Sequence, residues 1–397
     1  MKQVLILTPT YDPSKDGLAE AAKVTACGLA VRGYRVTVAT GCLPDRGTQA
    51  ADANPMVKQF RVSGNSSLRV GIHGDVAAYQ EFIANFPVDF IICHGWEVWT
   101  TDLAAPVFHK TPAKKVLASH GFSAHLVHGH RRFPWGLGQW LGWLPYVVRS
   151  PFLMRKFSRV VLLSKRVDRQ RFFDHRIAKL TGYRGIVVIP NGVDPRAFER
   201  PLPDFRREFG IGEGCMFLCV ANYYTHKNQE LTLRAFRQAR VDGATLVFIG
   251  SEFNEYQAMV RDLDQQLAKS HPEGRVVFLE KINREMTLGA FRACDVFVLT
   301  SKGENQPIVL LEAMACGKPF ISTESGCISE LVGGLVVHTE QEISEKMKYL
   351  SEHPEVRNAL GQTGREEILA HYTCERVVDA FDELLRSLTQ QTGSSLC

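Results

Sequence analysis

Several patterns that mark other classes of protein are absent from this chain of 397 residues. Its ten cysteines are scattered and form no CxxC pair, which argues against a zinc site and favours buried free thiols in a reducing cytoplasm. Neither GxGxxG nor GxxxxGK[ST] occurs, so the glycine patterns typical of dinucleotide and nucleoside triphosphate sites are missing. The first apolar run is too short for a signal peptide. The net charge, 47 − 42 or +5, is too small to indicate a nucleic-acid partner.

Short apolar runs alternate with amphipathic stretches along almost the whole chain, and the runs show no period-2 alternation. Such runs are typical of strands buried on both faces of parallel sheets. We expect strands at 4–7, 36–39, 90–93, 116–118, 160–163 and 186–189, and again at 217–220, 246–249, 276–279, 296–299 and 320–322. From Leu331 onward we expect helix, apart from the short apolar run 335–337. A stretch rich in proline and glycine at 190–212 separates the two series.

The sequence therefore predicts an α/β protein with two Rossmann-like, doubly wound parallel-sheet domains that face a central cleft. The expected N-terminal domain is 1–194 and the expected C-terminal domain is 195–373. A helix at about 374–389 is expected to pack back on the first domain. Ligands of open sheets bind at the carboxyl ends of the strands, so the site is expected there.

The most informative segment is 299–323, which reads LTSKGENQPIVLLEAMACGKPFIST. A strand ends at Thr300, and Pro307 is expected at the first position of the helix that follows, where its missing N–H costs nothing. The free N–H groups of Ile308 and Val309 would then form an anion site suited to phosphate. Glu304 and Glu312 flank such an anion, where carboxylates are suited to accept hydrogen bonds from ribose or sugar hydroxyls.

These residues resemble a family. Glu304 and Glu312 with the following AMACGKP resemble the signature of family 4 of the GT-B glycosyltransferases, retaining enzymes that move a sugar from a nucleotide diphosphate sugar. The resemblance extends to 189–194 (IPNGVD), 325–332 (SGCISELV), 119–121 (SHG) and 220–228 (VANYYTHKN), so it covers both expected domains.

The resemblance implies a GT-B fold and assigns roles to single residues. Glu304 matches the glutamate beside the donor sugar, and Glu312 matches the one that holds the ribose hydroxyls. Lys227 matches the lysine on the diphosphate, where an ammonium balances the charge of the leaving group. Gly17 matches a glycine of the first loop that approaches phosphate. His120 matches the histidine near the sugar hydroxyls.

The chain departs from the family at two places. The family usually has Gly-Arg before its lysine, and the arginine contacts the diphosphate; here Ala221-Asn222 stands there, which puts Asn222 among the expected donor-binding residues. His226, Lys281 and Arg284 are candidates to replace that charge, and the sequence does not choose among them. After Glu304 the family usually has glycines, whereas this chain has 305–307, Asn-Gln-Pro.

The resemblance implies a transfer with retention, in which Glu304, His120 and Lys227 act on the donor. No metal is expected, because Lys227 and the helix dipole can replace a divalent cation. No cofactor is expected beyond the nucleotide-sugar cosubstrate. Three alternatives stay open: a nucleotide-sugar epimerase of GT-B fold, a nucleotide-sugar-binding protein without catalysis, and a soluble transferase of the glycogen or sucrose type. The donor base, the sugar, the acceptor and the pathway cannot be read from the sequence.

One long stretch carries charge of a single sign. No Asp or Glu occurs from Leu103 to Val167, and the same stretch is rich in Lys, Arg and Trp. Its apolar part is interrupted by Pro145 and Arg149, so it is too short to span a bilayer. Basic residues beside Trp-rich apolar surface suit the headgroups of an anionic leaflet. The expected membrane or acceptor surface comprises Arg131, Arg132, Trp135, Trp140, Trp143, Arg155 and Lys156.

This surface lies in the domain that receives the acceptor in the resembling family. We therefore expect a lipid-linked, glycolipid or lipopolysaccharide-type acceptor, a role in the synthesis of cell-envelope polysaccharide or glycolipid, and a cytoplasmic protein peripheral to the cytoplasmic face of a membrane. The competing interpretation is a buried tryptophan core with a solvated basic rim.

Overall fold

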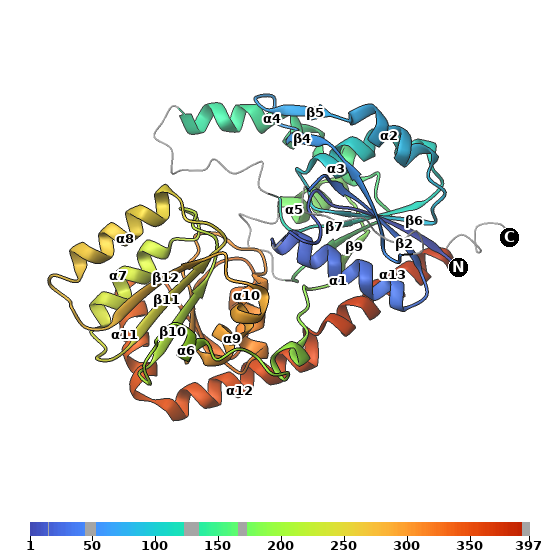
Figure 1. Cartoon of the computed structure of the whole chain (residues 1–397). Helices are drawn as coiled ribbons and strands as arrows, with labels where there is room; N and C mark the ends of the chain where they lie inside the picture. The colour runs from blue at the N-terminus through green and yellow to red at the C-terminus, as the bar shows by residue number, and fades with distance from the viewer. Residues whose placement is uncertain (15, 44–52, 123–134, 166–172, 391–397) are drawn as a thin grey trace. The chain divides into compact units, whose positions relative to one another are not determined.

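The computed structural model describes residues 1–14, 16–43, 53–122, 135–165 and 173–390, and it describes side chains in these ranges except at 135–140. Two compact units divide the chain: Met1–Asn191 with Cys374–Cys397, and Gly192–Thr373 (Figure 1). Each unit has its own parallel sheet with helices on both faces, as the alternation of apolar runs predicts.

The sheet of the first unit has seven parallel strands in the order β3-β2-β1-β6-β7-β8-β9. All six strands predicted for this half of the chain are present. Edge strand β3 was not predicted, because Met-Val-Lys-Gln-Phe is a weak apolar run next to cis-Pro55. The strands are β1 Gln3–Leu7, β2 Arg35–Gly41, β3 Met56–Phe60, β6 Phe90–His94, β7 Lys114–Ala118, β8 Arg159–Leu162 and β9 Ile186–Val188.

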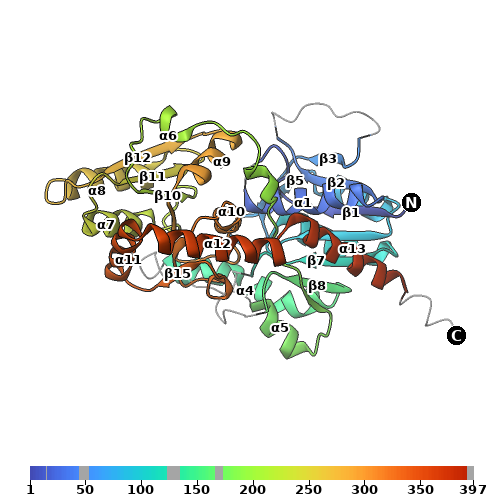
Figure 2. The ribbon, with the colours of Figure 1, turned by 90° about the horizontal axis from the view of Figure 1, so that it is seen from below.

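Helices cover both faces of this sheet, so consecutive strand residues are buried on opposite sides. Val4, Ile6 and Ile92 pack with α1 (Gly17–Val31) and α13 (Cys374–Gln390), which run side by side in Figures 1 and 2. Leu5, Leu7 and Ile91 face the opposite layer. That layer contains α2 Val76–Asn85, α3 Trp99–Ala104, the 3-10 helix Ala105–Lys110, α4 Trp135–Met154 and α5 Phe173–Thr181.

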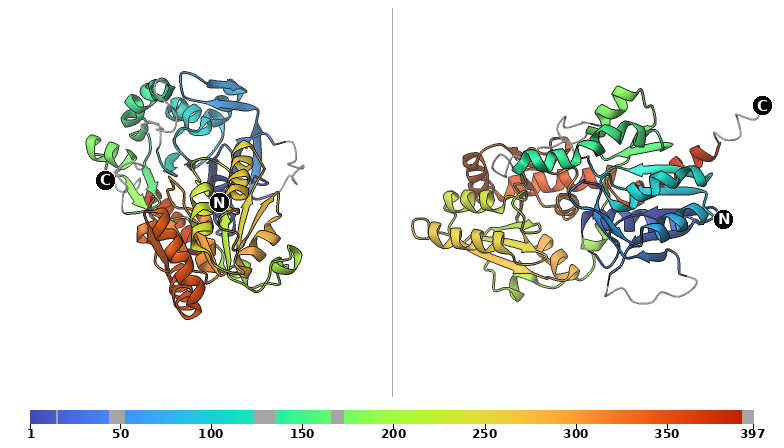
Figure 3. Two further views of the ribbon diagram at one scale, coloured as in Figure 1. Left: turned by 90° about the vertical axis from the view of Figure 1, so that its left-hand side faces the viewer. Right: turned by 90° about the horizontal axis from the view of Figure 1, so that it is seen from above.

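A two-stranded antiparallel ribbon, β4 (Val62–Asn65) and β5 (Gly71–Gly74), stands apart from the main sheet of the first unit (Figure 3). Strand β4 contacts α3, and the Leu68 N–H donates to the carbonyl of Gly142 in α4 at 2.9 Å. The ribbon was not predicted, because its glycines and polar residues give no apolar run.

The sheet of the second unit has six parallel strands in the order β12-β11-β10-β13-β14-β15. Five of them were predicted as strands, and the sixth, β15, falls on the short apolar run at 335–337. The strands are β10 Met216–Val220, β11 Thr245–Gly250, β12 Arg275–Glu280, β13 Val296–Leu299, β14 Phe320–Thr323 and β15 Gly334–Val337. One apolar cluster joins one face to α7 Gln229–Ala239, α8 Glu255–Leu267 and α11 Glu340–Glu352. Another joins the other face to α6 Phe205–Glu208, α9 Arg284–Ala293, α10 Ile308–Ala315 and α12 Pro354–His371.

Each sheet has one point at which the strand order reverses, and there the loops after two neighbouring strands diverge to opposite faces. In the first unit this point lies between β1 and β6, and in the second it lies between β10 and β13. Ligands of open α/β sheets bind beyond the carboxyl ends of the strands at this point. A ligand site is therefore expected in the loops after β1 and β6 in the first unit and after β10 and β13 in the second.

The packing of α13 on α1 depends on a glycine. A Cβ at Gly28 would lie 2.1 Å from Cγ2 of Val378, a branched side chain that is almost fully buried. We predict that Gly28→Ala lowers the free energy of unfolding by about 1–2 kcal/mol, because overpacking of about 1–3 kcal/mol outweighs the helix-propensity gain of about 1 kcal/mol. Urea unfolding of the variant measures this change.

The matched second variant is Val378→Ala, which removes the methyl groups that the new Cβ would meet. In the double variant most of the cost of Gly28→Ala should disappear, because only the Cβ of residue 378, at 2.9 Å, still meets the new methyl group, and the double-mutant cycle should give a coupling of about 0.5–3 kcal/mol. Strictly additive effects would contradict the contact.

Candidate active site

The loops at the strand-order reversal of the second unit bring two predicted residues together. Lys227 lies in the loop between β10 and α7, and Glu304 lies in the loop between β13 and α10. Lys227 Nζ is 2.6 Å from Glu304 Oε1, and the two side chains keep 23% and 10% of their exposure. A half-buried ammonium and a carboxylate are therefore held beyond the carboxyl end of the sheet, where a ligand is expected.

The segment after β14 clamps the loop that carries Glu304. The Glu304 N–H donates to Ser325 Oγ at 2.7 Å, and the Cys327 N–H donates to the Asn305 carbonyl at 2.9 Å. Gly326 has φ +58°, and a Cβ there would lie 2.3 Å from the Asn305 carbonyl oxygen, so the clamp requires glycine. This gives a physical role to the SGC triplet that the sequence analysis singled out.

Helix α10 begins one residue later than predicted. Pro307 is the N-cap, with extended backbone at φ −72° and ψ 116°, and Ile308 is the first helical residue; the prediction of Pro307 as the first helical position was wrong. The consequence for the N–H groups is unchanged: those of Ile308 and Val309 have no hydrogen-bond partner within the described chain. These two N–H groups and the helix dipole favour an anion at this point.

Glu312 lies on α10 and is only 4% exposed, so it is not the solvated surface charge that a generic helix position would give. A buried carboxylate requires a charge partner, and the Arg284 guanidinium, at the start of α9, pairs with it. Arg284 is one of three residues that the sequence analysis named as substitutes for the missing arginine. Of the other two, Lys281 pairs with Glu252 at 3.7 Å, and His226 stacks on Tyr224.

Asn222 joins the ends of two strands. Its Oδ1 accepts from the Ser251 N–H at 3.2 Å, and its carbonyl accepts from Gln229 Nε2 and the Tyr224 N–H. These bonds fix the β10 end against the β11 end. Its expected contact with the donor stays a prediction.

In the first unit, His120 follows β7 and lies beside His94, the last residue of β6. His94 Nδ1 and His120 Nε2 share a hydrogen bond at 3.1 Å, and the rings stack with centroids 5.3 Å apart. Burial lowers the pKa of His120 to about 4 and the pKa of His94 well below its ordinary value. Both imidazoles are therefore neutral at pH 7, and each can donate and accept a hydrogen bond without placing a charge at the strand ends.

Gly17 is the first residue of α1, but the N-terminus of this helix already has an anionic cap. Asp16 accepts from the N–H groups of Leu18 and Ala19 at 3.0 and 2.9 Å. The hydroxyls of Thr10 and Ser14 donate to the same carboxylate. A phosphate at Gly17 would have to share this start with Asp16, so the predicted contact has no support from the local geometry and stays a prediction.

The expected membrane or acceptor surface is only partly described. Arg131 and Arg132 lie outside the described residues, as do the side chains of Trp135 and Trp140. Trp143 is half-buried and meets Tyr146 edge-on, with ring centroids 5.6 Å apart. Arg155 and Lys156 are exposed, and each donates to a backbone carbonyl, of Thr181 and Ala105 respectively.

Three structural features at these strand ends were not predicted as site residues: His94, Asp16 and the pairing of Glu312 with Arg284. His94 could have been found, because it ends an apolar strand as His120 does. Asp16 carries the N-cap signal of an acidic residue before a helix. A DxD triplet, Asp262–Asp264, lies in α8, and Asp264 pairs with Arg237 at 2.7 Å, so that carboxylate fixes α8 to α7. The described residues contain no cluster of potential metal ligands.

Residues 203–367 match the family described as Glycosyl transferases group 1. N-acetyl-alpha-D-glucosaminyl L-malate synthase of Bacillus anthracis is 29% identical over 212 residues, which are 51% of this chain and 53% of that enzyme. The chain thus spans about half the length of this first relative.

Two further similarities extend over nearly the whole chain. A GDP-mannose-dependent alpha-(1-6)-phosphatidylinositol monomannoside mannosyltransferase of Mycobacterium tuberculosis is 25% identical over 412 residues, covering 97% of this chain and 98% of that enzyme. The structure of sucrose-phosphate synthase from Thermosynechococcus elongatus matches with a TM-score of 0.77 and 18% identity, over 98% of this chain and all of that one. The expected GT-B fold and the resemblance to family 4 are confirmed.

Replacement of Lys227 tests whether its ammonium meets a diphosphate. We predict that Lys227→Ala weakens the binding of UDP or GDP about 10-fold or more, because a charge-assisted hydrogen bond contributes about 1.5–3 kcal/mol. Isothermal titration calorimetry measures the affinity. The control is Lys269→Ala, which removes an exposed ammonium just beyond α8. Equal affinities in the two variants would remove Lys227 from the site.

The neutral histidine pair predicts a pH dependence. Because the folded-state pKa of His120 is about 4, below the unfolded value of about 6.5, the unfolded chain binds more protons between these values. The contribution of His120 to stability is therefore complete above pH 6.5 and is lost as the pH falls towards 4. NMR titration of the imidazole should give a midpoint near 4, and His120→Gln should reduce the loss of stability over this window. A midpoint between 6 and 7 would contradict a buried neutral pair.

Proposed function

We propose that this protein, whose two units have the GT-B fold and whose residues 203–367 match the group 1 glycosyl transferases, transfers a sugar from a nucleotide diphosphate sugar to a hydroxyl acceptor with retention. The observation that carries the proposal is the Lys227–Glu304 pair beyond the strand-order reversal of the second sheet, next in sequence to the open start of α10. This arrangement supplies a cation, two free N–H groups and a carboxylate for a diphosphate sugar.

The proposed chemistry follows from where charge develops. The anomeric bond to phosphate breaks through an oxocarbenium-like transition state, and negative charge builds on the departing diphosphate. Lys227 and the N–H groups of Ile308 and Val309 stabilise that charge. Arg284, which already neutralises Glu312, supplies a further guanidinium near the nucleotide. These groups let the leaving group depart without a divalent cation.

The carboxylates orient the donor in this proposal. Glu312 accepts from the ribose hydroxyls, and Glu304 accepts from the sugar while Lys227 holds its carboxylate in place. Neutral His120 donates to or accepts from a sugar hydroxyl. The acceptor hydroxyl attacks the anomeric carbon from the face that the diphosphate leaves. The new glycosidic C–O bond forms as the bond to phosphate breaks, and the hydroxyl proton passes to the departing phosphate oxygen, which preserves the anomeric configuration without a covalent enzyme intermediate.

We also propose a membrane-associated acceptor. The Mycobacterium tuberculosis relative is named for a phosphatidylinositol monomannoside acceptor and for GDP-mannose as donor. By analogy, this chain would use a glycolipid, lipid-linked or lipopolysaccharide-type acceptor in the synthesis of the cell envelope. The described helices include none that is long and apolar enough to cross a bilayer. We propose that contact with such an acceptor uses a surface of the protein.

Helix α4 supports this part of the proposal. Leu141, Pro145, Val148 and Phe152 are exposed at positions i, i+4, i+7 and i+11, so they form one apolar stripe along the helix. Exposed basic residues accompany the stripe: Arg149, Arg155 and Lys156. An apolar stripe with basic residues beside it suits the headgroup region of an anionic leaflet on the cytoplasmic side.

The alternatives make different predictions. An epimerase would release an epimerised nucleotide sugar without any acceptor, and a binding protein without catalysis would bind donor tightly with no turnover. Both named enzymes with which the sequence aligns transfer or join groups, which favours transfer. The structural match to sucrose-phosphate synthase concerns the fold alone and does not select a soluble acceptor.

The test of transfer is the configuration of the product. We expect that the full chain, given GDP-mannose, UDP-glucose or UDP-N-acetylglucosamine with a bacterial glycolipid extract, moves one sugar to an acceptor hydroxyl and keeps the α configuration of the donor. Proton NMR of the purified product reads the anomeric coupling. Inversion, or a free epimerised nucleotide sugar as the sole product, would contradict the proposal.

Vesicle flotation tests the surface of α4. We expect the protein to float with vesicles of phosphatidylcholine and phosphatidylglycerol, to bind phosphatidylcholine alone weakly, and to be released by 1 M salt, where the screening length falls to about 3 Å. Replacing Arg149, Arg155 and Lys156 together with Gln should weaken binding. The matched control replaces three exposed basic residues of the second unit, Arg207, Lys269 and Lys348. Binding that ignores lipid charge would refute the surface.

A further inference from the structure

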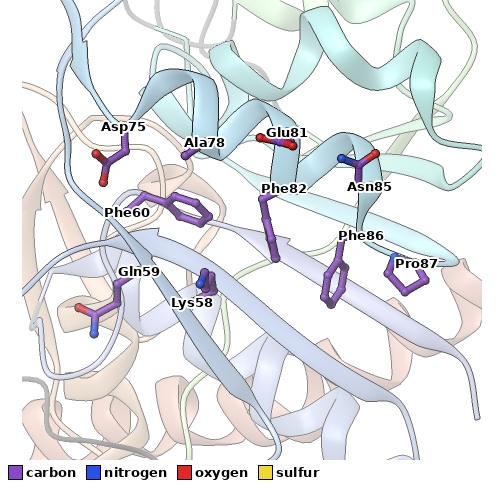
Figure 4. A pocket seen from close by; sticks show the side chains of 10 residues that line it. All are labelled: Lys58, Gln59, Phe60, Asp75, Ala78, Glu81, Phe82, Asn85, Phe86 and Pro87. Atoms are coloured by element: carbon purple, nitrogen blue, oxygen red, sulfur yellow. The ribbon is translucent and has the colours of Figure 1, made fainter.

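The first unit contains a groove that the proposed reaction does not use. It has a volume of about 540 Å³ and lies between edge strand β3 and helix α2 (Figure 4). Its volume falls within the range of about 300–1,000 Å³ that is common for small-molecule sites. The groove is defined here by six of its lining residues, three aromatic and three polar: Phe60, Phe82, Phe86, Lys58, Glu81 and Asn85.

Three phenylalanine rings form its apolar floor. The ring centroids of Phe60 and Phe82 are 5.4 Å apart, and those of Phe82 and Phe86 are 4.8 Å apart. Phe60 is buried beneath Tyr79, while Phe82 and Phe86 are half-buried, so part of each of these two rings is accessible. Figure 4 shows both rings pointing from α2 towards β3. The floor is therefore a row of aromatic rings rather than a closed core.

Polar groups stand along this row of rings. The side chains of Lys58, Glu81 and Asn85 are exposed and have no hydrogen-bond or ion-pair partner in the described part of the chain. Two more lining side chains use only some of their polar atoms within the protein. Gln59 Oε1 accepts from the Leu43 N–H, so the Gln59 NH₂ can donate to a ligand, and one oxygen of Asp75 accepts from the Arg61 N–H. The lining thus offers ammonium and amide donors together with carboxylate and amide acceptors.

The charge of the groove lining excludes two classes of ligand, anions and acyl chains. One Lys and two carboxylates, Asp75 and Glu81, give a net charge of +1 − 2, or −1. A phosphate or another anion would be repelled by the two carboxylates. An acyl chain would cover the rings but would strip water from three charged groups without replacing their hydrogen bonds, which is costly.

We propose that this groove binds a neutral saccharide chain. A pyranose ring presents apolar C–H groups that pack on phenylalanine faces, and its hydroxyls donate to carboxylates and accept from ammonium and amide N–H groups. An aromatic row with unpaired donors and acceptors of both kinds matches this amphipathic ligand. A purely apolar or a purely ionic ligand would satisfy only half of the lining.

The position of the groove gives the bound saccharide a role that rests on the proposed function. Phe60 pairs in register with Gly41, beyond the Ala39–Leu7 pair, so this end of the groove lies at the carboxyl edge of the sheet, whereas Phe86, which precedes β6, lies towards the amino edge. His94 and His120 end their strands at the same edge of this unit. A saccharide in the groove would be the part of the acceptor, or of the growing product, that lies away from the reacting hydroxyl.

The test measures saccharide binding without donor or turnover. Saturation-transfer difference NMR of the full chain uses maltotetraose and α-1,6-mannotetraose as neutral probes at millimolar concentration, with laurate as the acyl probe. We expect saturation of ring protons of at least one saccharide. Glu81→Ala with Asn85→Ala removes two exposed polar groups of α2 and should weaken binding about tenfold, the loss expected for two hydrogen bonds.

The matched control is Glu383→Ala, which removes an exposed carboxylate of α13 and should leave saccharide binding unchanged. Phe86→Ala should also weaken binding, and circular dichroism checks that the variant is folded. Absence of saturation for both saccharides, equal binding in the double variant, or binding of laurate instead would overturn the proposal.

A second measurement separates this proposal from the proposed function. Calorimetry with UDP and GDP reports the nucleotide site of the second unit, which the groove variants should not change. Saccharide binding without any nucleotide binding would uphold the groove and refute the transferase. Nucleotide binding and sugar transfer without saccharide binding in the groove would uphold the transferase and refute the groove proposal.

Discussion

The ion pair between Lys227 and Glu304 is the interaction on which the account of the second unit depends. Neither residue belongs to a strand or helix, and their loops are 77 positions apart in sequence. They meet because β10 and β13 are neighbours at the reversal of strand order, where the loops leave in opposite directions. A half-buried cation that lacked this carboxylate would be costly to hold in place before a ligand arrives. The pair therefore holds the Lys227 ammonium in place in the free protein, as the proposed contact with a diphosphate requires.

A buried charged group needs a charge partner, and the two units meet this requirement in different ways. In the second unit the buried Glu312 has Arg284, and the start of α10 supplies N–H groups, so the site is arranged around ions. In the first unit His94 and His120, at the ends of β6 and β7, are neutral at pH 7, because burial lowers the pKa of both. In the proposed reaction the diphosphate uses the first kind of site, and a sugar hydroxyl uses the second.

Sequence predicted much of the fold because buried parallel strands are continuous apolar runs. Eleven such runs were predicted as strands, and all are strands of the two sheets. The edge strand β3 and the β4–β5 ribbon were missed, since edge and solvent-facing strands need no apolar run. Helix α10 was placed one residue too early at Pro307, an error within the usual uncertainty of helix ends.

The candidate site was predictable in its residues but not in its contacts. Spacing in the sequence drew attention to Glu304, Glu312 and Lys227, but only the sheet order brings Lys227 to Glu304. Arg284 was one of three candidates, and its pairing with Glu312 depends on how α9 packs beside α10. Asp16 caps the start of α1 and so occupies the N–H groups that a phosphate at Gly17 would need, which the position of the glycine in the sequence did not indicate.

The central claim is that the second unit holds a nucleotide diphosphate sugar with Glu312 on the ribose. Thermal and urea unfolding of the full chain in the presence of a panel of UDP-, GDP-, ADP- and dTDP-sugars tests it most directly. The account predicts that one donor class stabilises the protein by about 2.7 kcal/mol at 100 times its dissociation constant. Glu312→Ala should weaken that donor by about 1.5–3 kcal/mol. No stabilisation by any nucleotide sugar, or an unchanged response in the variant, would contradict the claim.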